Sequence, residues 1–455
     1  MDAAKAFGQY LDVLAATGRP APSPVLGAVN AAGLDALRDA IAAYRPDPMA
    51  VAGVTPAEMF APDYGVNLMR INLPVDAAAS FRCGVPNLGS LLAVVANDSF
   101  HPTAQLVRNC PEGLTVCSLN NVPGHLADRV LSTMQRGLKA GGAAAAVNAA
   151  LLADGVLVHV ARGVKVEKAV QIVSISSAST PLLSPRRVVV IAEEEAEVKV
   201  LLCDHSQTPA EHLNSEVVDI LADSNSHVEV YDIEEGNAST RRYCQFNGLQ
   251  QAGSHLTVNS TFLHGGRTRN EFRIEVAGDY ADTSLSGLAI CGGEQIVDNQ
   301  VTLVHNARHC TSRQLFKNAL FDCSHGGFGG KIIVAEGAMF TDAAQTNRNL
   351  LAGDDARMTA APQLEIYCDE VKCSHGATTG QLDERALFYM QARGIPRDEA
   401  RRMLTQAFMV DVIDNISFEV LRQRLHILVE KRLSGAAASC DSCATSCHTE
   451  QQPEE

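Results

Sequence analysis

The sequence contains no tryptophan, and aromatic residues make up only 5% of its 455 positions. Sugar-binding grooves and base-stacking surfaces depend on aromatic side chains, so both kinds of site are disfavoured. Acidic residues outnumber basic ones, and the formal net charge is −15. Nucleic acid and anionic membranes attract basic patches, and neither is therefore expected as a partner.

Targeting and nucleotide-binding signals are missing as well. Residues 1–20 lack the basic segment and apolar run of a signal peptide. No uncharged apolar run reaches the roughly 18 residues that suggest a transmembrane helix. We therefore expect a cytoplasmic protein whose thirteen cysteines are mostly reduced thiols. The chain has no G-x-x-x-x-G-K-[ST] phosphate-binding loop, so it is not expected to hydrolyse ATP itself.

The middle of the chain carries a weak internal repeat. A small residue opens a short strand-like run about every 26 to 31 residues, at Ala196, Ser226, Ser254, Ala281, Ala307 and Ala338. Periods of about 20–50 residues are typical of solenoids, in which each coil covers the apolar face of the next. The drifting period favours a β-helix, and a β-sandwich with evenly spaced turns is the alternative. The glycine run at residues 326–330 is predicted to be a tight turn of this solenoid.

Changes in composition divide the chain into five predicted parts. They are a mostly helical N-terminal region (1–95), a mixed connecting region (96–154), a β-helix core (155–375), a C-terminal helical domain (376–433) and a flexible, cysteine-rich acidic tail (434–455). The helical domain contains an apolar stripe with i, i+3, i+7, i+10 spacing, formed by Phe418, Leu421, Leu425 and Leu428. We predict that this stripe is a partner-binding helix face, although taken alone such a stripe more often packs on its own domain.

Two groups of residues have metal-ligating chemistry. Cys373 and His375 lie two positions apart where a strand pattern ends, so an extended backbone places both on one side. Thiolate and imidazole suit iron, zinc or iron–sulfur clusters, although a C-x-H pair alone is more often a buried cysteine beside a satisfied histidine.

The tail forms the second group, with ligands at Cys440, Cys443, Cys447 and His448. Four such ligands can surround a tetrahedral zinc ion. Ordering the tail costs about 1–2 kcal/mol of backbone entropy per residue, which offsets most of the binding energy. We expect weak or transient metal binding there, or a disordered tail with exposed thiols.

The string from Pro362 to Ile395 resembles the C-terminal signature of the SufB/SufD family of iron–sulfur cluster assembly proteins. Four upstream segments stand in the family's order, at residues 298–305, 312–317, 330–334 and 342–351. SufB-like chains carry an acidic residue directly after the histidine of this signature. Here Gly376 follows His375, which is similar to the SufD branch.

The resemblance implies a right-handed parallel β-helix core flanked by N-terminal and C-terminal helices. It implies a non-enzymatic subunit of a SufBCD-type scaffold, which pairs with a SufB-like paralogue through the β-helix and docks a SufC-like ATPase through the C-terminal helices. Cys373 and His375 would help to form a nascent iron–sulfur cluster at the SufB interface, and no cofactor of its own is implied. The alternatives are a SufB-type scaffold and a β-helix polysaccharide-active enzyme. The enzyme is disfavoured by the few aromatic residues, by the lack of a secretion signal, and because Cys373 and His375 stand at the strand end in place of paired acids.

Overall fold

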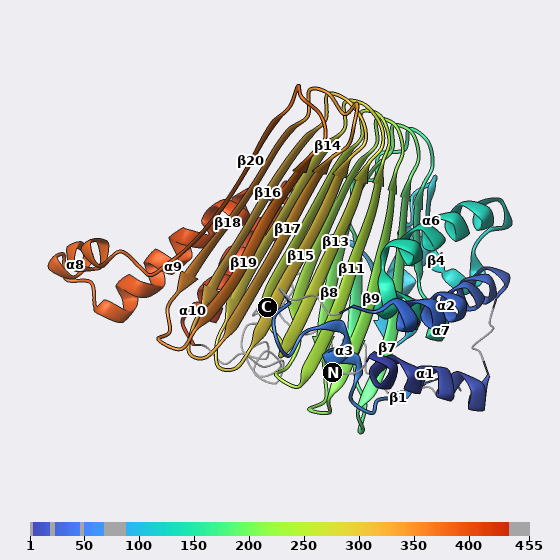
Figure 1. Cartoon of the computed structure of the whole chain (residues 1–455), viewed down its shortest axis with the longest axis horizontal. Coiled ribbons are helices and arrows are strands. Elements are labelled where there is room, and N and C mark those ends of the chain that lie inside the picture. The colour runs from blue at the N-terminus through green and yellow to red at the C-terminus, as the bar shows by residue number, and fades with distance from the viewer. Residues whose placement is uncertain (1–2, 19–22, 46–49, 68–87, 436–455) are drawn as a thin grey trace, which may run out of the picture.

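The protein is described here by a computed structural model covering residues 3–18, 23–45, 50–67 and 88–435. Strands dominate the fold, and helices gather at its two ends (Figure 1). The helices and 3-10 turns are α1 (Ala3–Thr17), α2 (Pro24–Ala43), α3 (Pro56–Phe60), α5 (Ala104–Asn109), η1 (Leu119–Asn121), η2 (Gly124–Leu126), α6 (Ala127–Ala140), α7 (Gly142–Leu151), α8 (Glu384–Ala392), α9 (Arg397–Asp414) and α10 (Glu419–Leu433). The strands are β1 (Gly65–Val66), β2 (Leu91–Ala96), β3 (Ser99–Pro102), β4 (Leu114–Ser118), β5 (Val156–Val160), β6 (Val170–Ser176), β7 (Leu182–Ala192), β8 (Glu197–Ser206), β9 (His212–Ala222), β10 (His227–Glu235), β11 (Thr240–Gln250), β12 (His255–His264), β13 (Arg267–Val276), β14 (Asp282–Cys291), β15 (Ile296–His305), β16 (Thr311–Leu320), β17 (His325–Val334), β18 (Asp342–Leu351), β19 (Arg357–Ile366) and β20 (Lys372–Gly380).

The strands form two sheets that face each other across a continuous core. One sheet has the order β19-β17-β15-β13-β11-β9-β7-β5-β4, with β1 beside β7, and the other runs β20-β18-β16-β14-β12-β10-β8-β6-β2-β3. From β6 onward successive strands alternate between the sheets, and all of their pairings are parallel. This is a β-solenoid, and the predicted β-helix core with helices at both ends is confirmed.

The repeat marks one corner of each coil. A residue with left-handed backbone precedes the small residue, as Glu195 (φ 61°) precedes Ala196. The register predicted at Ala307 and Ala338 is wrong by three residues. The corresponding left-handed residues there are His309 and Phe340. The corner positions that follow them are Cys310 and Thr341, and the two alanines lie earlier in the same turns.

The space between the sheets is mostly apolar, but it contains a buried ionic network. The Arg242 guanidinium is fully buried and lies 2.9 Å from the Glu216 carboxylate and 2.8 Å from the Asp232 carboxylate. Glu234 lies beside the same guanidinium and accepts a hydrogen bond of 2.6 Å from Thr268. Burial raises the pKa of Glu234 to about 8, since a desolvated carboxylate is less stable than the neutral acid.

The glycine run lies within strand β17, so the prediction of a turn at residues 326–330 is wrong. Side chains arriving from other strands occupy the space where β-carbons would stand. A β-carbon on Gly329 would lie 2.0 Å from Gln300 Oε1, and one on Gly330 would lie 2.4 Å from the amide atoms of Gln345. The run is therefore required by cross-strand packing.

A Gly330→Ala variant is expected to lower the free energy of unfolding by about 1–3 kcal/mol, the usual cost of overpacking a core. The added methyl group must displace the buried Gln345 amide. Gly380→Ala is the matched control, because a β-carbon there meets no atom within 4 Å. Denaturant unfolding measures both, and equal stability of the two variants would contradict the packing described here.

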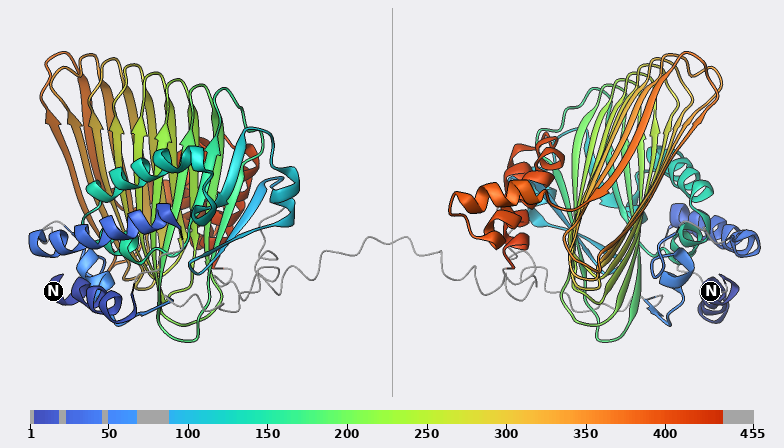
Figure 2. Two further views of the ribbon diagram at one scale, coloured as in Figure 1. Left: turned by 90° about the vertical axis from the view of Figure 1, so that its right-hand side faces the viewer. Right: turned by 60° about the vertical axis from the view of Figure 1, so that its left-hand side comes forward.

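Helices cover the outer faces of both sheets on opposite sides of the solenoid (Figure 2). Helices α6 and α7 pack against β7 and β9, while α9 and α10 pack against β12, β14 and β16. At the second interface Lys317 is buried, with its ammonium 2.7 Å from the Phe408 carbonyl and 2.6 Å from the Asp411 carboxylate. This lysine therefore links β16 of the solenoid to α9 by a hydrogen bond and an ion pair.

Replacing Lys317 with Met is expected to loosen α9 while leaving the solenoid intact. The change removes a charge-assisted hydrogen bond worth about 1.5–3 kcal/mol. The freed Asp411 carboxylate is half exposed and remains hydrated. Hydrogen exchange should show faster amide exchange in residues 397–433 but not in β7–β13. Equal acceleration in both regions would contradict a local role.

Candidate functional site

The solenoid ends in two open strand edges, one on each sheet. Strands β19 and β20 stand last in their sheets, and no described strand pairs with their outer sides. In β20 the Lys372 N–H bonds to Thr341 O at 2.8 Å, so the N–H groups of alternate residues, including Ala377, face outward. The same alternation puts Pro362 of β19 at an outward position, where it lacks a donor. An open edge such as that of β20 is a template for pairing with another chain.

Cys373 lies on β20 with its side chain directed between the sheets. Its in-register neighbour is the buried Ala343, and it packs beside Cys368 against a small cluster around Ile332 and Val334. Burial raises the pKa of the Cys373 thiol, so the protonated thiol predominates at neutral pH in the isolated chain.

His375 stands two residues further along β20, on the same side of the strand as Cys373. Its in-register neighbour is Gln345, which is 1% exposed and also points between the sheets. β20 is the last of the described strands, so no described coil covers His375, and the residue is exposed. The thiol and imidazole thus lie along one open edge, as their spacing predicts.

The predicted metal site in the tail cannot be placed, and the described residues contain no other complete metal site. The tail ligands Cys440, Cys443, Cys447 and His448 lie outside the described residues. Within the described part, no three His, Cys, Asp or Glu side chains are grouped so that they could hold a metal ion. None of the described helices is long and apolar enough to cross a bilayer.

The apolar stripe of the C-terminal helices faces the solenoid and is not free to bind a partner. Leu421 and Leu425 are each 1% exposed and pack on the solenoid, with Phe418 and Leu428 partly buried in the same cluster. These four residues are therefore covered by the chain itself, because Leu201, Tyr231 and Ile233 of the sheet supply the apolar surface beneath them. The large exposed apolar residues of these helices are instead Phe388, Tyr389, Met403, Val420 and Ile427.

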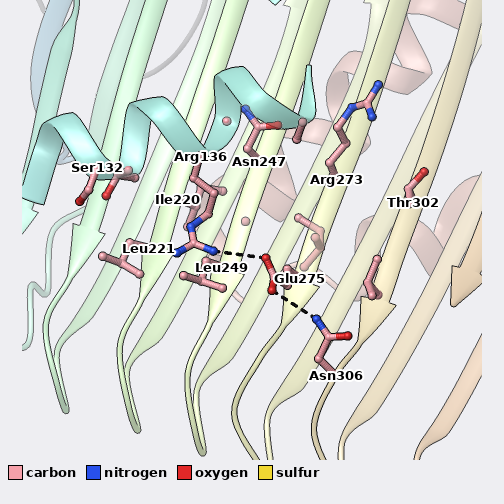
Figure 3. Close-up of a pocket in the computed structure, with 16 residues that line it drawn as sticks. Ser132, Arg136, Ile220, Leu221, Asn247, Leu249, Arg273, Glu275, Thr302 and Asn306 are labelled. Atoms are coloured by element: carbon pink, nitrogen blue, oxygen red, sulfur yellow. Dashed lines mark hydrogen bonds and ion pairs between the residues drawn. The ribbon is translucent and has the colours of Figure 1, made fainter. Parts of the chain in front are cut away.

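A cavity of about 270 Å³ lies between α6 and the outer face of the sheet (Figure 3). Its floor is apolar, with Leu221, Leu249 and Val304, and the charged residues of its rim are all paired, Arg273 with Glu271 outside the cavity. Glu275 lies 3.3 Å from the Arg136 guanidinium and accepts a bond of 3.2 Å from the Asn306 amide. This cavity lies on a different part of the molecule from Cys373 and His375 and adds no ligand to them.

Together these features define a β-solenoid protein with an open strand edge that carries a cysteine and a histidine. Its sequence matches the family model for the SUF system FeS cluster assembly, SufBD core domain, over residues 174–408, and that for the SufBD protein N-terminal region over residues 55–172. The chain belongs to the SufB/SufD family, which is involved in iron–sulfur cluster assembly.

Relatives within the family include proteins called SufD. The iron–sulfur cluster assembly protein SufD of Escherichia coli is 33% identical over 245 residues, which cover 54% of this chain and 58% of the relative. A SufBD family protein of Synechocystis is 25% identical over 372 residues, covering 80% and 82% of the two chains. SufD of Bacillus subtilis is 25% identical over 292 residues, covering 63% and 66%.

Sequence reasoning missed Gln345 and Gln314, which line the solenoid beneath His375. A signal was available, because Gln314, Gln345 and His375 follow one another at about the spacing of the repeat. Residues one coil apart stack in register in a solenoid, so a polar residue recurring at that interval predicts a polar ladder.

Proposed function

We propose that this chain is a SufD-like subunit of a SufBCD-type scaffold that assembles iron–sulfur clusters, without enzymatic turnover of its own. The observation that carries the proposal is the open edge of β20, which presents His375 beside Cys373. This edge would pair with the solenoid of a SufB-like paralogue. Backbone hydrogen bonds across the new strand pair would supply affinity, and the side chains would supply specificity.

The nascent cluster would be a cargo formed where the two solenoids meet. Cys373 and His375 offer one sulfur and one nitrogen, both suited to iron. Two ligands are too few to hold iron alone, and the described residues provide no third one nearby. The remaining ligands would come from sulfide and from the paralogue, so assembly would require the complex.

The C-terminal helices would dock a SufC-like ATPase through their outward side. Phe388 and Tyr389 of α8 are 73% and 60% exposed. Val420 and Ile427 of α10 stand seven residues apart on one helix face. Exposed aromatic and aliphatic groups of this kind are favourable anchors for a protein partner, whereas the stripe containing Leu421 and Leu425 is already buried.

Co-expression with the SufB-like and SufC-like proteins of the same genome tests the proposal. A tagged chain is expected to retain both partners through purification. Ala377→Pro should abolish pairing with the paralogue, because it removes an outward N–H while leaving the bonds to β18 intact. Ala377→Val, which keeps the donor, is the matched control. A chain that purifies alone from such cells contradicts the proposed complex.

A further inference from the structure

One row of lumen residues changes from apolar to polar in the last three coils of the solenoid. His375, Gln345 and Gln314 occupy one in-register row, and the row continues inward with Leu285 and Val258. The deeper positions are apolar, as expected of a core. The polar positions begin only beneath the open end that carries His375.

The two glutamines are bonded to each other but not fully satisfied. Gln345 donates its amide N–H to Gln314 Oε1 at 2.7 Å. Gln345 is 1% exposed and Gln314 is 3% exposed, yet Gln345 Oε1 and Gln314 Nε2 have no hydrogen-bond partner. Leaving a buried polar atom unsatisfied costs about 1–3 kcal/mol. A leucine pair like the residues deeper in the row would avoid that cost.

The amide of Gln345 is also held in a defined place. Its oxygen and nitrogen lie over Gly330 of the opposite sheet, where any β-carbon would approach within 2.4 Å. The Gln314 bond fixes one side of the amide and Gly330 leaves room for it. The unpaired oxygen belongs to the in-register neighbour of His375. The exposed His375 ring makes no hydrogen bond to it in this structure and must turn toward the lumen to reach it.

We propose that Gln345 is a positioning residue that accepts a hydrogen bond from the ring N–H of His375. The bond would fix one tautomer of the imidazole and leave the lone pair of the other ring nitrogen free to bind iron. Metal-binding histidines commonly donate their second nitrogen in this way, which orients the ring and strengthens the ligand. The inference rests on the proposed function, since it assigns the amide to the same ligand.

The neighbouring lumen amide does not serve the same purpose. Asn347 is the next inward-facing residue of β18. Its amide N–H donates a hydrogen bond of 3.3 Å to Phe316 O, and its amide oxygen accepts one of 2.6 Å from the Asn349 amide. Its in-register neighbour on β20 is Ala377. Asn347 is buried on the same strand as Gln345, so it provides a control for the loss of a lumen amide.

The test uses the full chain with ¹⁵N-labelled histidine, and the His375 signals are assigned by their loss in His375→Gln. At about pH 8, where imidazoles are neutral, the wild-type chain is expected to show one predominant His375 tautomer. Gln345→Leu should give mixed tautomers and a 10–100-fold slower cluster assembly in the complete complex, the usual effect of removing such a partner. Gln345→Glu, which also accepts an N–H, should restore the single tautomer, and Asn347→Leu should leave it unchanged.

A wild-type His375 with the tautomer mixture of a free imidazole would overturn the inference, whether or not Gln345→Leu folds. So would equal effects of Gln345→Leu and Asn347→Leu on the tautomer. The proposed function fails separately, if His375→Ala keeps full assembly activity. In that case the tautomer measurements still decide whether Gln345 positions the ring.

Discussion

A His375→Ala chain is expected to fold, keep both partners and lose iron–sulfur cluster assembly almost completely. The side chain is exposed on the edge strand β20, so its removal leaves no cavity. What disappears is a nitrogen ligand at the interface where the cluster would form. Reconstitution of the complete complex with iron and a sulfur source measures the rate, and thermal unfolding measures stability.

Ser374→Ala is the matched control, because Ser374 is the exposed neighbour that points to the other side of β20. It should assemble clusters at the wild-type rate. Full activity of His375→Ala would falsify the ligand role. An insoluble His375→Ala chain would instead indicate that the histidine is needed for folding, the commoner role of such a residue.

The sequence predicts the solenoid because its signal is periodic and local. Apolar runs and small corner residues recur at about the length of one coil, so the β-helix can be inferred without knowing any contact. The register at Ala307 and Ala338 fails because the corner positions there carry Cys310 and Thr341, while an alanine stands three residues earlier in each turn. The role of Gly330 cannot be predicted locally either, since the side chain that excludes a β-carbon comes from β18.

The candidate site divides in the same way. The shared side of Cys373 and His375 follows from two-residue spacing in a strand. Periodicity also identifies the stripe of Leu421 and Leu425, but an apolar face has the same pattern whether it meets its own domain or a partner. Only the position of the sheet beneath α10 shows that this face is covered.

Substituting the exposed apolar residues of the C-terminal helices is expected to weaken ATPase docking strongly while leaving the pairing with the paralogue intact. A Phe388→Ser/Tyr389→Ser double variant removes two aromatic groups that are 73% and 60% exposed. Loss of one such anchor typically costs 2 kcal/mol or more, so we expect at least a roughly 30-fold weaker affinity for the SufC-like ATPase. Val420→Ser/Ile427→Ser tests the α10 face in the same way.

Point substitutions are preferable to removal of residues 383–435, because that deletion would strip the cover from Leu201, Tyr231 and Ile233 and destabilise the solenoid itself. Val107→Ser is the control, since Val107 is 70% exposed on α5. Affinity is measured by calorimetry with purified ATPase, and pairing by co-purification with the paralogue. Unchanged ATPase affinity in both double variants would exclude these helix faces as the docking surface. Loss of the paralogue with retention of the ATPase would contradict the assignment, because these helix faces would then be needed for pairing and not for ATPase docking.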